Sequence, residues 1–306
     1  MPSSTSKLSD PRYILFFLIC GLSLALNWAA VKNLVVVSLR VDEYSHTILI
    51  PFLAAAIIYR ERTKVFAQAR YSVRLGVVLV TAAALMGMVF GANAPVAGQN
   101  GAFAVRIMEL VLIWIGTFVL CFGWEALRAG KFTLIFLLLT VPIPDDVLGK
   151  LIYLVRYGSS EVTSFWFAVF NVPVFREKFS FMLPTVTIEV ATECSGIHST
   201  MALLIVALLA GHLLVRSKLK QAALVLSAIP IVCFSNGVRI AAVTLLSIYV
   251  NKSFLSGKLH HEGGFLFFGL ALFMMAAELY LMGSRPGPPR QKATPLVSAS
   301  VLPPGN

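Results

Sequence analysis

The sequence has few charged residues, and this scarcity excludes an ordinary soluble globular protein. Only 13% of the 306 residues are charged, whereas 58% are hydrophobic and the mean hydropathy is +0.84. The apolar residues form long blocks rather than amphipathic stripes. Such blocks are typical of membrane-spanning helices. We therefore expect an all-α polytopic membrane protein.

Cysteine is also scarce, and the four cysteines form no recognisable framework. No Cys-x-x-Cys pair occurs, which argues against a structural zinc site, and no metal or organic cofactor is expected. Cys20, Cys121 and Cys233 lie in or at the ends of apolar blocks, where a small packing residue is the usual interpretation. Cys194 differs because polar and flexible neighbours surround it.

Charges and turn residues divide the chain into eight apolar blocks. They lie near residues 13–30, 46–59, 75–93, 103–122, 132–144, 197–215, 221–250 and 262–283. The second and fifth are shorter than the roughly 20 residues that cross a bilayer, so partial entry into the membrane is open for both. We expect one transmembrane domain over residues 13–283, after a short N-terminal segment, residues 1–12. The tail 284–306, rich in Pro, Ser and Gly, is expected to be disordered.

The net charge of +11 is better explained by topology than by a nucleic-acid partner, and none is expected. Lys and Arg gather at 60–74, 128–131 and 216–220 and near both ends of the chain, which all fall on one side if the helices alternate. The positive-inside rule then places both termini in the cytoplasm. We expect the protein to lie in the inner (cytoplasmic) membrane.

The longest connection, residues 145–192, is predicted on the opposite, extracytoplasmic side. Val186, Ile188 and Val190 alternate with less apolar residues, which is typical of a strand. With the apolar residues at 179–182 they predict a small hairpin before Cys194. The earlier part has helical apolar spacing over 148–155 and is expected to lie on the outer leaflet.

Three residue types suited to acyl chemistry fall in the same outer layer. Cys194 precedes a helix that starts outside, where the helix dipole favours a thiolate. Arg239 lies roughly 28 Å along its helix from the cytoplasmic border, about the thickness of the hydrocarbon core. His260 and His261 precede the last helix, which also starts outside. The pattern predicts that a thiol, a guanidinium and an imidazole meet at one border.

Five stretches of the chain resemble the ordered motifs of the exosortase and archaeosortase family, over roughly residues 10–283. They are Tyr44-Ser45-His46 with Ile50-Pro51, Val141-Pro142-Ile143-Pro144, Glu193-Cys194-Ser195-Gly196-Ile197, Asn236-Gly237-Val238-Arg239-Ile240, and Leu259-His260-His261-Glu262-Gly263-Gly264-Phe265. The resemblance implies a cysteine transpeptidase acting on membrane-anchored proteins with a C-terminal sorting signal. Such a signal comprises a Pro-Glu-Pro-like motif, one membrane helix and a basic end.

The resemblance also implies roles for individual residues. Cys194 would be the nucleophile, Arg239 the catalytic arginine and His260 the catalytic histidine. His261 is the alternative histidine, because the two stand in succession. We expect the substrate to be bound by Tyr44, Ser45, His46 and Asn236.

Several alternatives stay open at this stage. Arg239 would also suit an interfacial anchor that reaches lipid headgroups. His198, four residues after Cys194, would serve as a local base or bond at the interface, and His46 would line a cleft or cap a helix. For the whole chain the alternatives are a transporter, which usually shows inverted repeats not visible here, and a noncatalytic component of exopolysaccharide export.

Overall fold

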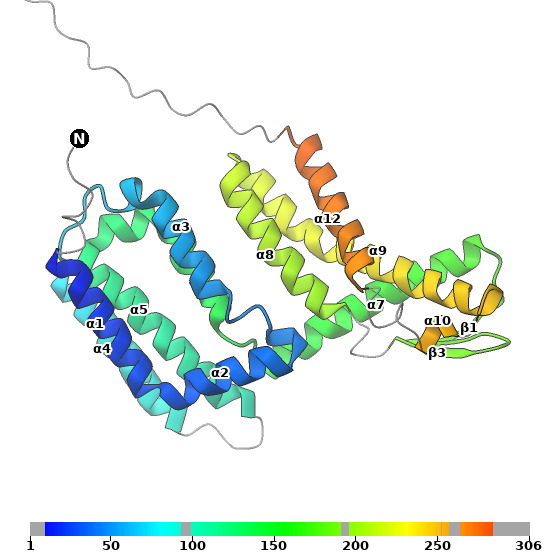
Figure 1. The fold of residues 1–306 in the computed structure, drawn as a ribbon, viewed down its shortest axis with the longest axis horizontal. Coiled ribbons are helices and arrows are strands. Elements are labelled where there is room, and N and C mark those ends of the chain that lie inside the picture. Colours follow the sequence, from blue (N-terminus) through cyan, green and yellow to red (C-terminus); the bar gives the residue numbers. More distant parts are fainter. Residues whose placement is uncertain (1–9, 93–98, 191–195, 252, 257–263, 284–306) are drawn as a thin grey trace, which may run out of the picture.

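The computed structural model describes residues 10–92, 99–190, 196–251, 253–256 and 264–283. Within these ranges almost all regular structure is helical (Figure 1). The helices are α1 (Pro11–Leu26), α2 (Trp28–Arg40), α3 (Ile50–Val65), α4 (Val73–Ala92), α5 (Gln99–Ala129), α6 (Lys131–Phe136), α7 (Asp145–Val169), α8 (Ile197–Leu214), α9 (Lys218–Tyr249), α10 (Ser253–Ser256) and α12 (Gly264–Leu281). Two short 3-10 helices, η1 (Asp42–Tyr44) and η2 (Leu137–Thr140), complete the helical segments of the described chain.

The predicted polytopic all-α architecture is confirmed, whereas the predicted count of eight spans is not. In the described ranges, five helices are long and apolar enough to cross a bilayer by themselves, namely α4, α5, α8, α9 and α12. Two bent pairs, α1 with α2 and α6–η2 with α7, raise the number to at most seven. The predicted second block corresponds to α3, whose 16 residues are too few for this test.

The first predicted helix, 13–30, is broken in the structure. Asp10 caps the start of α1, because its carboxylate accepts the Arg12 amide at 3.0 Å, and Asn27 caps its end. The Asn27 side chain donates to the carbonyl of Ser23 at 3.2 Å and so competes with the helical ladder. α2 then leaves at 79° to α1. The apolar pattern alone does not reveal this bend, because both arms are apolar.

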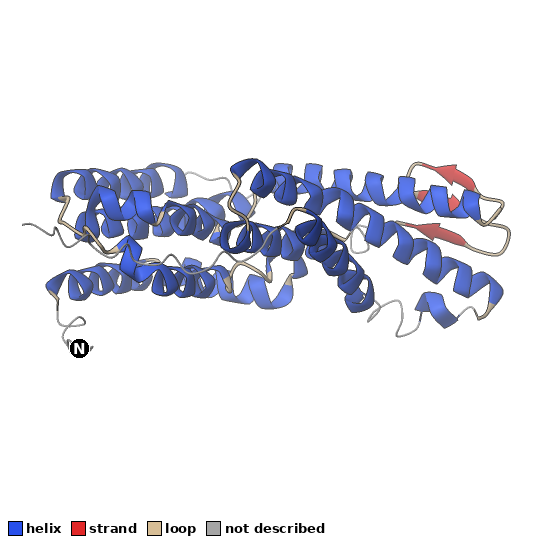
Figure 2. Ribbon diagram, turned by 90° about the horizontal axis from the view of Figure 1, so that it is seen from above, coloured by secondary structure: helices blue, strands red, loops and turns tan. Residues whose placement is uncertain are grey.

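The segment before Cys194 contains the predicted hairpin and one strand more. β2 (Ser180–Met182) pairs antiparallel with β3 (Thr187–Glu189), as the alternation predicts, and β1 (Phe175–Glu177) adds a third strand on the other side of β2. The sheet lies at one end of the elongated molecule (Figure 2). It is beside the C-terminal halves of α7 and α9, which are labelled in Figure 1. Phe167, Phe181, Val190 and Ala241 form the buried cluster that joins sheet and helices.

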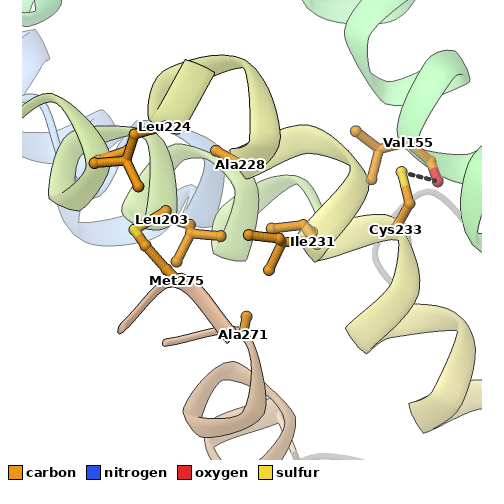
Figure 3. Packing of buried hydrophobic residues seen from close by; sticks show 10 residues of the cluster. Val155, Leu203, Leu224, Ala228, Ile231, Cys233, Ala271 and Met275 are labelled. Atoms are coloured by element: carbon orange, nitrogen blue, oxygen red, sulfur yellow. Dashed lines mark hydrogen bonds between the residues drawn. The ribbon is translucent and has the colours of Figure 1, made fainter. Parts of the chain in front are cut away.

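α7 is longer than the expected helix at 148–155 and packs against α9 along much of its length. α7, α8, α9 and α12 contribute residues to one core, in which Val155, Leu203, Leu224 and Met275 are fully buried (Figure 3). α12 packs mainly against α9, and only 11% of the residues of α12 are buried. The second and third cores join α1, α2, α3, α5 and α6 at the other end of the molecule (Figure 1).

Candidate active site

A small cavity lies where the described parts of three of the motifs meet. It is a small hollow, partly open to solvent, between α8, α9 and α12. Its walls are Ser199, Val232, Ser235, Asn236, Arg239, Gly264, Phe267, Phe268 and Ala271. Arg239, predicted as the catalytic arginine, is therefore half-buried in a cavity wall, as an inward-facing role requires.

The other two predicted catalytic groups, Cys194 and the His260/His261 pair, lie outside the described residues. Ser199, five residues after Cys194, is part of the cavity wall, and so is Gly264, four residues after His260. The structure thus brings the flanks of all three motifs to one place, although they are far apart in the sequence.

Asn236 connects the arginine motif to the cysteine motif. Its side chain is buried, and its Nδ2 donates to the Ser159 hydroxyl at 3.1 Å. A Cβ on Gly196 would lie 3.2 Å from Asn236 Cγ and 3.3 Å from its Nδ2. Gly196 precedes α8 with a φ of 81°, in the left-handed region that favours glycine. The described end of the cysteine motif is therefore packed tightly against Asn236.

The early Tyr-Ser-His element lies beside the same region. Ser45 Oγ is 3.3 Å from Nδ1 of the exposed His198 in the first turn of α8. Tyr44 is buried, and its hydroxyl donates to the carbonyl of Ile143 in the Pro-rich motif at 3.4 Å. Within the described ranges, the buried Nδ1 of His46 makes no hydrogen bond of good geometry. Four of the five motifs are thus in contact through described residues, with His198 bonding at the surface.

Burial changes the titration of two of these side chains. Burial, assisted by the carboxylates of Asp145 and Glu43, raises the pKa of the Tyr44 hydroxyl. Burial also lowers the pKa of His46, the neighbouring His198 adds to this effect, and a hydrogen bond with the Glu43 backbone opposes it. Tyr44 is therefore a neutral hydrogen-bond donor, and His46 is mainly a neutral imidazole at pH 7.

Two residues of α7 that the sequence analysis did not select contact the motifs. Ser159 accepts the bond from Asn236, and Arg156 Nε donates to the carbonyl of Val190, the last described residue before Cys194. The available signal was the polar run Gly158-Ser159-Ser160-Glu161 inside an otherwise apolar helix. That run resembles an ordinary solvated turn until its partners on other elements are known.

The remaining cysteines and the acidic residues bear on two further points, metal binding and packing. Within the described ranges, no group of three or more His, Cys, Asp or Glu side chains has a geometry that would hold a metal ion. Cys121 and Cys233 are buried and Cys20 is half-buried, as packing residues would be.

Comparison with known proteins gives one match. The family model described as transmembrane exosortase matches residues 38–277. No curated protein and no solved structure matches the chain.

Proposed function

Because the chain belongs to the transmembrane exosortase family, we propose that it is a membrane cysteine transpeptidase that cleaves C-terminal sorting signals of exported proteins. Cleavage would occur on the extracytoplasmic face, and the processed protein would pass to an acceptor through a thioester. The distribution of Lys and Arg supports this orientation, with both termini in the cytoplasm.

The observation that carries the proposal is the shared cavity. Arg239 is in its wall, together with Ser199 from the cysteine-motif helix and Gly264 from the histidine-motif helix. Cys194 is two residues from Gly196, and two extended residues reach about 7 Å at most. This chain connectivity supports a thiol close to Asn236 and the cavity.

The first chemical step uses the three groups in different roles. A thiol with an ordinary pKa of about 8.5 is mostly protonated at neutral pH, and a nearby imidazolium or guanidinium stabilises the thiolate. The Cys194 sulfur attacks the scissile carbonyl, a carbon–sulfur bond forms, and the carbonyl electrons move to oxygen. Arg239 stabilises this oxyanion, because a guanidinium stays charged and offers several donors in a rigid fork.

The second step releases the sorting signal. The oxyanion collapses, the carbon–nitrogen bond breaks, and the His260 imidazolium gives its proton to the departing amine. The thioester then reacts with an amine, a hydroxyl or water, and the neutral imidazole takes the proton of this nucleophile. The cysteine returns to its thiolate form.

The substrate class suits a site at the membrane border. A helix anchored by basic residues inside the cell presents its outer juxtamembrane peptide at the level predicted for Cys194 and Arg239. Cleavage there needs no extraction of the helix from lipid. Tyr44, Ser45 and His46, next to His198, are proposed to contact the peptide, together with Asn236.

The test is co-expression with a protein that carries such a sorting signal, followed by measurement of its processed fraction. Cys194→Ala, Arg239→Ala and His260→Ala are expected to abolish processing at normal membrane levels. Loss with His261→Ala and not with His260→Ala would transfer the histidine role by one residue. Full processing by Cys194→Ala would disprove the proposed enzyme.

A further inference from the structure

One turn of α7 contacts the chain on both sides of the segment that carries Cys194. Arg156 bonds to Val190 before the segment, and Ser159 holds Asn236, which packs against Gly196 after it. We propose that Arg156 and Ser159 are positioning residues for the Cys194 thiol. This inference rests on the proposed function, in which Cys194 is the nucleophile.

Before the segment, the Arg156 guanidinium contacts three residues at the end of the sheet. Nε donates to the Val190 carbonyl, Nη2 lies 3.1 Å from Glu189 Oε1, and the guanidinium carbon lies 4.2 Å from the centroid of the Phe179 ring. The Val190 amide in turn donates to the Phe179 carbonyl at 2.9 Å. Val190 is only 1% exposed. The end of the sheet is therefore held by a charge-assisted bond, a ring contact and burial together.

The contact after the segment has a different chemistry. Ser159 is fully buried, and its hydroxyl accepts the Asn236 amide. The Asn236 amide group occupies the space next to Gly196, so Gly196 has little freedom to move toward α9. The Gly196 carbonyl accepts both the amide and the hydroxyl of Thr200, each at 2.9 Å, which ties it to the first turn of α8.

Both contacts depend on α7 and α9, and these two helices pack closely against each other. A Cβ on Gly237 would lie 2.5 Å from Val162 Cβ, and a Cβ on Gly158 would lie 2.6 Å from the Cys233 sulfur. Thr163 Oγ1 also donates to the Gly237 carbonyl at 3.3 Å. Residues without side chains at these crossings let the helix backbones pack at short range.

Fixed flanks matter because the attack of a thiolate on a carbonyl depends on alignment. Misplacement of a reacting group by about 1 Å can reduce the rate by about a hundredfold. Only five residues separate Val190 from Gly196, so displacement of either flank changes where the thiol can lie. Arg156 and Ser159 act on these flanks and have no role in bond making.

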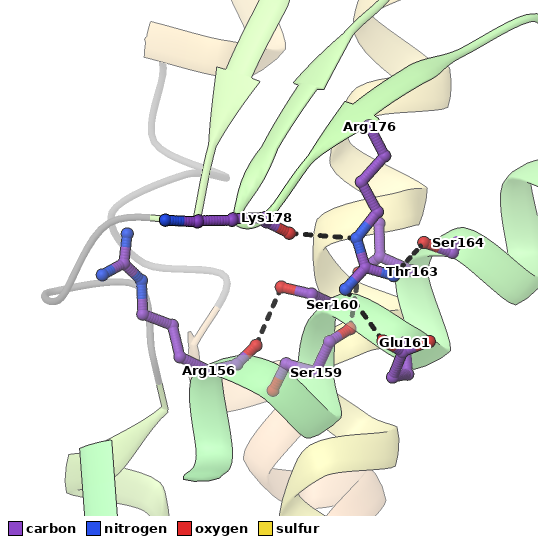
Figure 4. Close-up of polar contacts among 8 residues, drawn as sticks. All are labelled: Arg156, Ser159, Ser160, Glu161, Thr163, Ser164, Arg176 and Lys178. Carbon is purple, nitrogen blue, oxygen red and sulfur yellow. Dashed lines mark hydrogen bonds and ion pairs between the residues drawn. The ribbon is translucent and has the colours of Figure 1, made fainter. Parts of the chain in front are cut away.

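Arg176 provides a matched control. It reaches α7 from β1 and lies 2.9 Å from Glu161 Oε1 and 2.9 Å from Ser164 Oγ, whereas Arg156 projects from α7 itself (Figure 4). The two side chains have similar exposure, 23% for Arg176 and 18% for Arg156. Both join α7 to the sheet, but the contacts described for Arg176 involve no residue that borders the Cys194 segment.

The experiment compares Arg156→Met, Arg156→Lys, Ser159→Ala and Arg176→Met with the wild type in the co-expression assay, normalised to membrane level. In parallel, the rate at which iodoacetamide alkylates Cys194 in isolated membranes is followed against pH by mass spectrometry. We expect Arg156→Met and Ser159→Ala to lower processing about ten- to a hundredfold. Their alkylation midpoint should rise toward that of an ordinary thiol, near 8.5. Arg176→Met should stay within about threefold of the wild type. Arg156→Lys keeps the charge but lacks the fork that bonds both Val190 and Glu189, so its processing should fall between those of Arg156→Met and the wild type.

Two results would overturn the inference. One is an equal loss of processing in Arg176→Met and Arg156→Met, which would show a general structural role. The other is an unchanged alkylation profile of Cys194 in both Arg156→Met and Ser159→Ala. Failure of the proposed function would be a separate result, because Cys194→Ala would then still process the substrate. The alkylation of Cys194 in the Arg156 and Ser159 variants would still test the positioning.

Discussion

Replacement of Gly196 by alanine tests the junction between the cysteine and arginine motifs. At a φ of 81°, an L-residue costs about 1–2 kcal/mol more than glycine. The new Cβ would lie 3.2 Å from Asn236 Cγ, closer than the usual contact of about 3.5–4.0 Å between carbons. Asn236 must therefore shift, which weakens its 3.1 Å bond to Ser159, a buried bond of a kind worth about 1 kcal/mol.

The combined cost is about 2 kcal/mol, which corresponds to roughly thirtyfold in the population of the native arrangement. We expect Gly196→Ala to lower processing by up to this factor and to lower the thermal midpoint in detergent by a few degrees. The assays are the processed fraction of a co-expressed sorting-signal protein and a thermal unfolding scan of the purified protein.

Gly211→Ala, inside α8, is the control for the change at Gly196, which directly precedes α8. Its Cβ would meet no atom closer than 3.6 Å, its φ is not positive, and alanine is the better helix former by roughly 0.5–1 kcal/mol. This variant should match or slightly exceed the wild type in thermal midpoint. If Gly196→Ala behaved like Gly211→Ala in both assays, the tight contact between Gly196 and Asn236 would be refuted.

Three further predictions concern neighbouring contacts. Asn236→Ala and Ser159→Ala should be non-additive in a double-mutant cycle, with a coupling of about 1 kcal/mol in thermal stability, and additive losses would contradict their hydrogen bond. Burial lowers the pKa of His46, so this side chain binds a proton more tightly in the unfolded protein than in the folded one. The contribution of neutral His46 to the free energy of unfolding is therefore complete above its unfolded pKa of about 6.5 and is lost as the pH falls below that value. Between pH 7.5 and 5.5 the thermal midpoint of the wild type should therefore fall more than that of His46→Asn, and parallel falls would exclude this linkage. Gly158→Ala should destabilise the protein by about 1–3 kcal/mol through overpacking against Cys233, and the additional change Cys233→Ala should restore much of the loss; no rescue would show that the clash lies elsewhere.

Much of the helical architecture could be predicted from apolar blocks, because an uninterrupted hydrophobic run of about 18 residues or more is typical of a transmembrane helix. The blocks that became α4, α5, α8, α9 and α12 were located to within a few residues at most ends. The bend at Asn27 was missed because it lies inside a continuous apolar run that predicts one helix. The third strand, β1, was missed because Phe175-Arg176-Glu177 contains one apolar residue and no alternation that would indicate a strand.

For the candidate site, the sequence indicated positions along the chain but not partners across it. Arg239 and Asn236 were selected because their polarity is conspicuous in an apolar helix, and both line the cavity; their predicted roles in catalysis and substrate binding stay predictions. Ser159 and Arg156 were not selected, because their importance lies only in what they contact on α9 and at the end of β3. The contacts that distinguish Ser159 and Arg156 from residues on a solvated turn exist only in the folded arrangement.

The weak attachment of α12 has a consequence for how the three motifs come together. Helix association in lipid depends on close packing, and α12 offers this along α9, where Ala271 and Met275 are buried and the Ser235 hydroxyl donates to the Phe267 carbonyl. The thiol and guanidinium motifs belong to the well-packed α7–α8–α9 unit, whereas the histidine motif leads into the least secured helix of the described spans. Bilayer thickness and an incoming substrate helix would then influence the placement of the histidine motif, in which we propose the proton donor, more strongly than that of the other two motifs.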